Sequence, residues 1–398
     1  MSIKLSNETN DYRQEMVAAM KSGKEDDYAK AFAAMSGAIA ERVKADFLEL
    51  QDSNDSAVLA KRGYRQLTTK ETKWYQKVIA AAKSVNPKQE FTAIIGSDNE
   101  EDVMPVTIIQ DVYKDLQEEY PLLKAIRFQH VGYITKWILN DHATQMAVWG
   151  QITDEITKEI NSAFRVIDID QNKLSAYAMI EVGMLDLGPV FLDGYIRACL
   201  KEAMLGAFEM GLVSGNGVNQ PIGLIRDIHE GVSYSSTDGY PAKAAVPVKD
   251  FTPATYGDLV ARMAVTEKGK KRRFAKVGMI VNQSDYLTKV MPATTVLNAQ
   301  GAYVNNLFPF PTTVYVSNAV DEGKAVLFLE NEYFLGVGGS KNGVIEYSDE
   351  YKWLEDMRVF KVKQYATGRA TDNTCALYLD ISALEPAYIT VKDVTVTA

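Results

Sequence analysis

One stretch near the middle of the chain constrains the fold more than any other. Pro189 suits the first turn of a helix, because its missing N–H would be unpaired there, and the glycine-rich run 211–217 supplies a stop. Between them, apolar residues recur at intervals of three and four, namely Leu192, Ile196, Cys199, Ala203, Ala207 and Met210. The sequence predicts a helix from Pro189 to Leu212, ~37 Å long, with one face against a partner. Periodicity alone would also fit a single buried helix of any α+β protein.

Length and composition narrow the class of protein. The 398 residues, 46% of them hydrophobic, can bury a large core, and we expect about two or three structural units. No apolar run approaches the ~18 residues needed to cross a bilayer, and the N-terminus lacks the apolar core of a secretory signal. We therefore expect a soluble, cytoplasmic protein with no membrane partner. A formal net charge of −9 argues against a dedicated duplex binder, so contact with nucleic acid is expected to be weak and local.

The first 85 or so residues form a compositional unit, because all twelve prolines lie at Pro87 or later. Within this unit, apolar residues recur every three or four positions, at Tyr28, Phe32, Met35, Ile39, Val43, Phe47 and Leu50. They predict an amphipathic helix. A second helix is predicted over 68–83, where Thr68 or Thr69 with Glu71 resembles a capping box. Neither helix has enough apolar surface for its own core, so we expect docking on the rest of the chain or self-association; a solvated helical arm is the alternative.

The next segment changes from helical to extended patterns. An acidic hinge is predicted over 95–103, followed by a helix over 109–119 that ends ahead of Pro121. Residues 126–139 and 164–182 are rich in β-formers and predict two long strands. The excursion of more than twenty residues between them, 140–163, is long for a compact domain, and such loops are generally functional or reach a partner.

Beyond the long helix the pattern predicts a mixed α/β arrangement. A helix is expected over 256–265, then a basic connector over 268–276 that we expect to be solvated, a buried strand over 277–281 and the start of a further helix at 282–286. Further strands are expected over 312–316, 325–329, 344–347, 357–365, 376–381 and 387–391. The fold class predicted from these elements is α+β.

No arrangement of residues predicts catalysis. The three histidines, His130, His142 and His229, have no metal-ligand spacing. The glycines at 215, 217 and 223 miss the dinucleotide spacing, because Gln220 stands where the third glycine belongs, and Ser214 and Ser340 are turn residues. Cys199 and Cys375 are expected to be reduced core thiols. We predict no catalytic residue, no cofactor and no metal site.

The order of these elements resembles a known family. A strand ending at Val182, then MLDLGP at 184–189, the long helix, and SGNGVNQPIGLI at 214–225 are similar to the major capsid proteins of tailed bacteriophages of the Hong-Kong-97 type. The most specific positions are Gly215-x-Gly217 followed by Pro221-x-Gly223, and the resemblance extends over residues 104 to about 390. It implies the Hong-Kong-97-type capsid fold and a structural protein, not an enzyme.

The resemblance also assigns parts to the chain. It implies that the predicted helix from Pro189 is the spine of a peripheral domain, and that the loop at 140–163 is the tip of an extended hairpin lying over a neighbouring subunit. The expected segments are a helical, scaffold-like N-terminal segment (1–103), an N-terminal arm (104–124), the extended hairpin loop (125–182), the spine helix (183–225), an axial domain (226–325), peripheral strands (326–375), and axial closing strands with the tail (376–398).

Partners follow from the same resemblance. It implies self-association as pentamers and hexamers into an icosahedral shell, portal and head-assembly proteins, and packaged double-stranded DNA bound without sequence specificity. Assembly is expected in the host cytoplasm and the protein in the virion capsid. Removal of the N-terminal segment by a maturation protease near 97–103 stays open.

One departure concerns covalent cross-linking. Some relatives join subunits through a lysine, an asparagine and a helping glutamate. Lys158 lies near the lysine position, but Asp356 and Lys363 stand where the asparagine and glutamate would be. An aspartate has no amide to lose as ammonia, so we predict no isopeptide bond.

Two alternative functions are kept. An encapsulin-like nanocompartment has the same implied fold, although the long N-terminal helical segment favours the phage capsid. A soluble α/β enzyme is the alternative of a different class, and it lacks a coherent set of catalytic residues.

Overall fold

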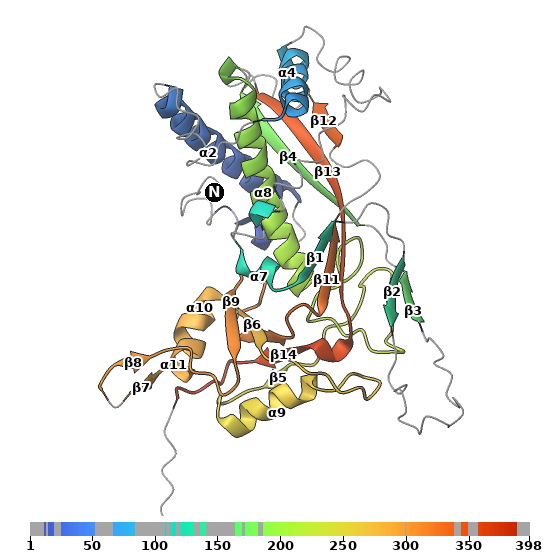
Figure 1. Cartoon of the computed structure of the whole chain (residues 1–398), viewed down its shortest axis with the longest axis vertical. Helices are drawn as coiled ribbons and strands as arrows, with labels where there is room; N and C mark the ends of the chain where they lie inside the picture. Colours follow the sequence, from blue (N-terminus) through green and yellow to red (C-terminus); the bar gives the residue numbers. More distant parts are fainter. Residues whose placement is uncertain are drawn as a thin grey trace, which may run out of the picture.

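The computed structural model shows two units, one above the other in Figure 1. We call them the α8 unit, above, and the α9 unit, below, after their principal helices. Each is built around a cluster of buried apolar side chains. The structure describes residues 12, 15–19, 25–51, 67–83, 108, 112, 114–116, 120–130, 136–140, 164–168, 172–181, 186–298, 300–337, 344–348 and 357–387.

Helix α8 (Pro189–Val213) is the long helix at the centre of the α8 unit (Figure 1). It begins after Gly188, whose φ of +90° glycine adopts readily, and the N–H of Ser214 ends it by donating to the carbonyl of Met210 at 2.9 Å. The predicted helix is thus confirmed, with one further residue. Its buried residues lie on all sides of the helix, so the expectation of a single apolar face was wrong. A helix that is apolar all round needs cover on several sides.

A five-stranded sheet covers one side of α8. Its long strand β13 (Met357–Ala370) pairs antiparallel with β4 and β12 through its first part and with β11 through its last five residues. Strand β1 then joins β11 in parallel. Both β4 and β13 contact α8. The other strands are β1 (Arg127–His130), β4 (Asn172–Glu181), β11 (Tyr333–Val337) and β12 (Val344–Ser348).

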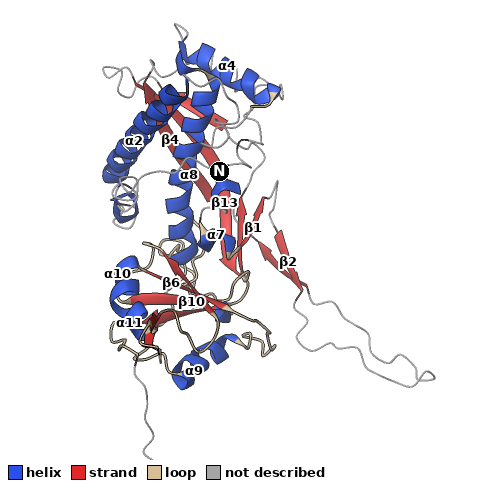
Figure 2. Ribbon diagram, turned by 60° about the vertical axis from the view of Figure 1, so that its left-hand side comes forward, coloured by secondary structure: helices blue, strands red, loops and turns tan. Residues whose placement is uncertain are grey.

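Two N-terminal helices, α2 (Glu25–Gln51) and α4 (Thr69–Lys83), dock on α8 (Figures 1 and 2). The predicted seam of α2 is buried at Phe32, Met35, Ile39 and Val43, all without exposed surface. Helix α4 begins with a capping box, in which the Thr68 N–H donates to Glu71 Oε2 at 2.8 Å and the Glu71 N–H donates to Thr68 Oγ1 at 3.3 Å. Docking on the rest of the chain is therefore confirmed for both helices.

The two long strands expected at 126–139 and 164–182 are each two shorter strands. Among the strands that the structure describes, β2 (Lys136–Asn140) and β3 (Phe164–Asp168) pair only with each other, as a hairpin stem. Strands β1 and β4, on the outer sides of that stem in sequence, join the sheet of the α8 unit instead. A period-two pattern reports an extended chain but not its partner, so the sequence could not show where one sheet ends and another begins. The loop 141–163 lies outside the described residues.

The segment around Pro121 differs from the prediction. Residues 108, 112 and 114–116 are helical, and the rest of the expected helix 109–119 lies outside the described residues. A separate short helix, α7 (Pro121–Lys124), follows, with its proline in the first turn. Proline ends a preceding helix, but it also starts a new one well, which explains the difference.

A second five-stranded sheet, in the order β5-β14-β10-β6-β9, forms the α9 unit. Its strands bury both faces: Met279 and Val281 of β6 face the core of the α9 unit, whereas Ile280 faces the core of the α8 unit. Gly278 is required here, because a Cβ would lie 2.4 Å from the ring of Phe328. The strands are β5 (Val246–Pro247), β6 (Val277–Val281), β9 (Thr312–Val316), β10 (Lys324–Phe328) and β14 (Ala376–Asp380).

Helices and a small hairpin complete the α9 unit. The expected helix at 256–265 is α9 (Pro253–Met263), capped by the Thr252 side chain. The expected helix at 282–286 is one turn, α10 (Gln283–Asp285), continued by a π-helix η2 (Tyr286–Val290) and α11 (Met291–Ala293). Strands β7 (Val296–Leu297) and β8 (Tyr303–Val304) form a hairpin that projects from the unit (Figure 1).

Several strand limits differ from the prediction. Strand β11 was not predicted, and β13 extends five residues beyond the expected end at Tyr365. The expected boundary at residue 325 falls inside β10, which pairs with β6 and β14, so all of β10 belongs to the α9 unit. The strand expected at 387–391 lies almost wholly outside the described residues.

Candidate functional surfaces

The side of α8 under the N-terminal helices carries buried polar groups. Asp193 accepts a hydrogen bond from the hydroxyl of Tyr75 on α4, with an O–O distance of 2.8 Å, and both residues are buried. The same carboxylate lies 3.7 Å from the guanidinium of Arg197, one turn along α8. Arg197 also forms a salt bridge with Asp115. A buried carboxylate is stable only with such partners, so this network fixes how α4 sits on α8.

A second polar contact joins α8 to α2. The Tyr195 side chain lies beside Ser36 of α2 and beside Cys199, and burial raises the pKa of Tyr195 well above its ordinary value. Burial also raises the pKa of the Cys199 thiol to about 12. A thiol and a phenol that stay protonated at neutral pH supply neither a nucleophile nor a base. These groups therefore have a structural role, as the sequence predicted for Cys199.

The glycine turn after α8 is a tightly packed joint. A Cβ on Gly215 would lie 2.1 Å from the carbonyl oxygen of Pro221, and one on Gly223 would lie 2.5 Å from that of Val213. The N–H of Gly223 donates to the carbonyl of Gly215 at 2.8 Å. The turn thus folds back on the end of the helix, and its glycines allow this close backbone approach. Arg226 adds to this packing by donating to the Ser214 carbonyl at 2.7 Å.

Lys243 holds the joint between the two units. Its half-buried side chain donates from Nζ to the backbone carbonyls of Leu224, Asn373 and Ala376 at 3.2, 2.7 and 2.9 Å. Burial lowers the pKa of Lys243 to about 8. The side chain therefore ties the segment after α8 to the segment that links β13 to β14.

The basic connector is mostly exposed, as predicted, although two of its cations also form ion pairs with the rest of the fold. Arg272 is largely buried and forms a salt bridge with Asp372 at 2.8 Å, and Lys276 pairs with Glu330. Arg272 and Arg273 also line a cavity of ≈ 490 Å³ beside α9, together with Tyr256, Val260, Phe274, Phe310 and neighbouring residues. Arg272 and Lys276 therefore anchor the connector to the fold, while most of its residues are exposed to solvent.

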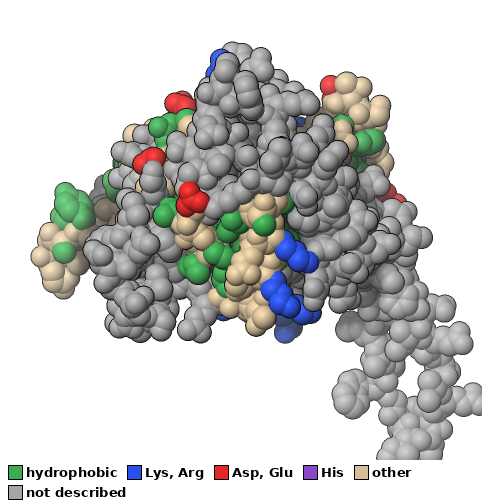
Figure 3. Space-filling view, turned by 90° about the horizontal axis from the view of Figure 1, so that it is seen from above, with side chains coloured by type: hydrophobic (Ala, Val, Ile, Leu, Met, Phe, Trp, Pro, Cys, Tyr) green, Lys and Arg blue, Asp and Glu red, His purple; other side chains and the backbone are tan. Residues whose placement is uncertain are grey.

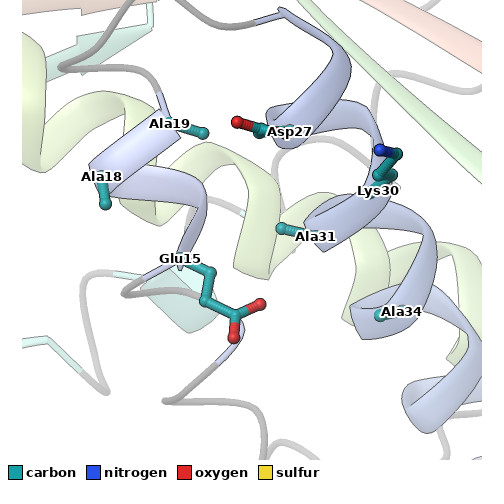
Figure 4. A pocket seen from close by; sticks show the side chains of 7 residues that line it. All are labelled: Glu15, Ala18, Ala19, Asp27, Lys30, Ala31 and Ala34. Carbon is teal, nitrogen blue, oxygen red and sulfur yellow. The ribbon is translucent and has the colours of Figure 1, made fainter.

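A second groove lies between residues 15–19 and α2 (Figure 4). Its volume is ≈ 670 Å³, and small side chains such as Ala19, Ala31 and Ala34 line it together with Glu15, Asp27 and Lys30. Alanines let two helices approach closely, so the groove follows from helix packing.

Exposed apolar side chains concentrate in one part of the α9 unit. Five of the eight large apolar side chains exposed among the described residues lie between positions 287 and 307. Tyr303, on the projecting β8, is 80% exposed. Exposed apolar residues grouped in this way mark contact surfaces more often than singly scattered ones do. The five are Leu287, Leu297, Tyr303, Val304 and Leu307, and we call them the hairpin patch.

The remaining residues that the sequence analysis singled out are scattered. His229 lies on the surface beside Asp227, His130 lies in β1, and His142 is outside the described residues. Lys158 and Asp356 also lie outside them, and Lys363 pairs with Val344 in the sheet. The cross-linking prediction therefore stays a prediction. Among the described residues, no group of three or more His, Cys, Asp or Glu could hold a metal ion, and no helix is long and apolar enough to cross a membrane.

Comparison with known proteins decides the family. A family model described as the phage capsid family matches residues 101–306, just over half of the chain. The chain belongs to the phage capsid family. No curated protein matches it.

Solved structures of shell proteins resemble this capsid protein distantly. The capsid of an empty GTA particle is 13% identical, with a TM-score of 0.43, over 66% of this chain and 89% of its own. A chain of the satellite phage P4 procapsid is 11% identical, with a TM-score of 0.43, over 70% and 99%. The SrpI encapsulin of Synechococcus elongatus is 12% identical, with a TM-score of 0.37, over 68% and 91%.

The protein is therefore a capsid protein of this family, and its fold is of the α+β class, as predicted. Sequence reasoning missed the contacts between Tyr75 and Asp193 and around Lys243. The only local signal was an acidic residue within the apolar stretch of α8 at Asp193. A charge among apolar neighbours predicts a partner, but not which one of the chain's many donors it is.

Proposed function

We propose that this protein is the major capsid protein of a tailed bacteriophage, and that it assembles as pentamers and hexamers into an icosahedral head around double-stranded DNA. The family match over residues 101–306 carries the proposal. Two features of the structure support it. Lys243 ties the segment after α8 to the start of β14, and the hairpin β7–β8, which carries Leu297, Tyr303 and Val304 of the hairpin patch, projects where a neighbouring subunit can contact it.

The expected division of the chain becomes a proposal about roles. The α8 unit would be the peripheral domain and α8 its spine, while the α9 unit, including all of β10, would be the axial domain that clusters around five- and six-fold axes. The stem β2–β3 would carry the extended loop over a neighbour. One surface that meets copies of itself repeatedly is what a closed shell needs.

The remaining partners are proposals as well. Portal and head-assembly proteins would join the shell in the host cytoplasm, and a maturation protease is a further candidate partner. DNA would be held without sequence specificity or tight binding. The net charge of −9 supports weak binding. Figure 3 shows that, on the described part of one face, apolar side chains lie among side chains of both charges. We propose no catalytic role for the protein.

Negative-stain microscopy with size-exclusion chromatography tests the self-association. We expect hollow shells or capsomers for the unaltered chain, and a compact monomer or dimer would contradict the proposal. The double variant Leu297→Ser with Tyr303→Ser should keep the melting temperature but lose assembly, because it removes two apolar side chains of the hairpin patch. Tyr234→Ser is the matched control, since Tyr234 is also an exposed tyrosine and lies outside that patch.

Packaged material separates the two kinds of shell. Particles isolated from infected or induced cells should contain double-stranded DNA protected from nuclease. An enzyme cargo without DNA would instead support the encapsulin-like alternative.

A further inference from the structure

Helix α8 depends on the N-terminal helices for a large part of its cover. Of its 25 residues, 19 are buried, including residues that no single face could hold. The sheet lies against one side of α8 through β4 and β13, while α2 and α4 both lie against α8, and α2 also contacts β4 (Figures 1 and 2). Without α2 and α4, part of this apolar helix would face water.

The apolar side of the contact resembles a domain core and not a transient interface. The seam of α2 is fully buried at its centre, and α4 adds Trp74 and Tyr75, which are 3% and 0% exposed. These side chains belong to one continuous cluster with Phe191, Leu192 and the rest of α8. Obligate interfaces have this apolar character, whereas the interfaces of segments that dissociate are usually more polar.

The polar side of the contact fixes one arrangement. The Tyr75 hydroxyl donates to the buried Asp193 carboxylate at 2.8 Å, and Ser36 of α2, which is fully buried, lies beside the buried Tyr195 side chain. Departure of α4 would leave Asp193 with one hydrogen-bond donor fewer. A buried charge that loses a hydrogen-bond donor is strongly disfavoured.

We propose that α2 and α4 stay bound to α8 in the assembled shell as a permanent layer of the α8 unit. The N-terminal segment is then not a scaffold that is discarded on maturation. Even if a protease cuts the chain within 97–103, the fragment that contains α2 and α4 remains attached without a covalent link. The inference rests on the proposed capsid function for its setting, but its contacts lie within one chain.

A cut introduced at a chosen place tests the inference directly. A recognition sequence for a site-specific protease is placed within 97–103 of the full-length chain, and the folded protein is cut and passed over a size-exclusion column. We expect the fragment to elute with the remainder at a one-to-one ratio, and to separate only in denaturant. Separate elution of the fragment from a remainder that keeps its melting temperature would overturn the inference.

A matched pair of variants shows whether the described contacts hold the fragment. Tyr75→Phe removes the hydroxyl that donates a hydrogen bond to Asp193. We therefore expect the cut fragment to dissociate at least about tenfold faster. Tyr28→Phe makes the same chemical change on α2, where Tyr28 stacks near Phe32, and should leave dissociation nearly unchanged. Equal rates for the two variants would mean that the Tyr75 contact does not hold the segment, and would count against the inference.

Intact mass of the chains in assembled particles extends the test to the shell. We expect either the full chain or both fragments in equal amounts. Shells that contain only the fragment beginning near residue 104 would overturn the inference while leaving the capsid function in place. Failure of the unaltered chain to form any shell would contradict the capsid function, whatever the fate of the fragment.

Discussion

The two units of the molecule build their cores in different ways. The core of the α8 unit gathers side chains from Met16 to Ala376, whereas that of the α9 unit is drawn from Val248 to Leu384 and mostly from one continuous stretch. The first also surrounds charged residues on its central helix, at Asp193, Lys201 and Glu202. Contacts distant in sequence form late and depend on many elements. The stability of the α8 unit therefore depends on more of the chain than that of the α9 unit does.

Two cysteines can report the opening of different regions, Cys199 in the α8 unit and Cys375 at the joint that leads into the α9 unit. Cys199 lies in α8, and Cys375 lies in the segment that leads into β14. Both thiols are free and buried, and burial raises the pKa of each to about 12. Labelling by a thiol reagent at pH 8 therefore measures how often each region opens, when reclosing is fast compared with labelling.

The largest effect is expected from Phe32→Ala, which removes a fully buried ring of α2 from the core of the α8 unit. Large-to-small changes of this kind cost ~3–5 kcal/mol. Labelling of Cys199 should rise by about a hundredfold or more, since ~1.4 kcal/mol corresponds to tenfold. Cys375 should change far less. Equal increases in the labelling of both thiols would show that the two units open together, and would contradict the difference between them.

The converse change is Leu327→Ala in β10, whose buried side chain lies in the core of the α9 unit. We expect a loss of ~2–5 kcal/mol. Here Cys375 should become accessible first, because β10 pairs with the strand that follows it. Cys199 should respond weakly, through the face of the sheet that packs on the α8 unit. Mass spectrometry of the labelled peptides distinguishes the two sites.

The helices and strands were easier to predict from the sequence than the way in which they pack and pair. Helix α8, the buried seam of α2 and strand β6 follow from local periodicity and from residues such as Pro189, and all were predicted. The partners of the extended segments were not predictable, because strands β1 and β2 share one pattern yet join different sheets. Likewise, nothing near Lys243 in sequence shows that it binds carbonyls 130 and 133 residues away. Pairing across long distances is decided by the whole fold, and one sequence does not contain that information in a local form.

A smaller effect is expected from pH at the joint between the units. The pKa of Lys243 is lowered from its ordinary 10.5 to about 8, first of all by burial. Between these values the unfolded chain binds more protons than the folded one, so the free energy of unfolding due to this group rises with pH. The two raised cysteine pKa values act in the opposite direction above about pH 9.

Lys243→Met isolates this contribution. Denaturant melts of both proteins at pH 7.5–9 should show a stability that rises more steeply with pH in the unaltered chain than in the variant. Identical slopes would mean that Lys243 titrates normally, and that it does not hold the joint as a partly buried cation.

The smallest change in stability is expected at the start of α4. It tests whether α4 alone affects the α8 unit and leaves the α9 unit unchanged. Thr68→Ala removes the side-chain oxygen that accepts from the Glu71 N–H, and loss of such a cap costs ~1 kcal/mol. Thr69→Ala is the control, because Thr69 is exposed and lies just inside the helix. Since α4 covers α8, the cap variant should raise labelling of Cys199 about fivefold and leave Cys375 unchanged. Circular dichroism would show whether the variant frays α4. If α4 frays while the labelling of Cys199 stays constant, α4 does not cover the part of α8 that contains Cys199. Of the two N-terminal helices, only α2 would then protect that part of the α8 unit.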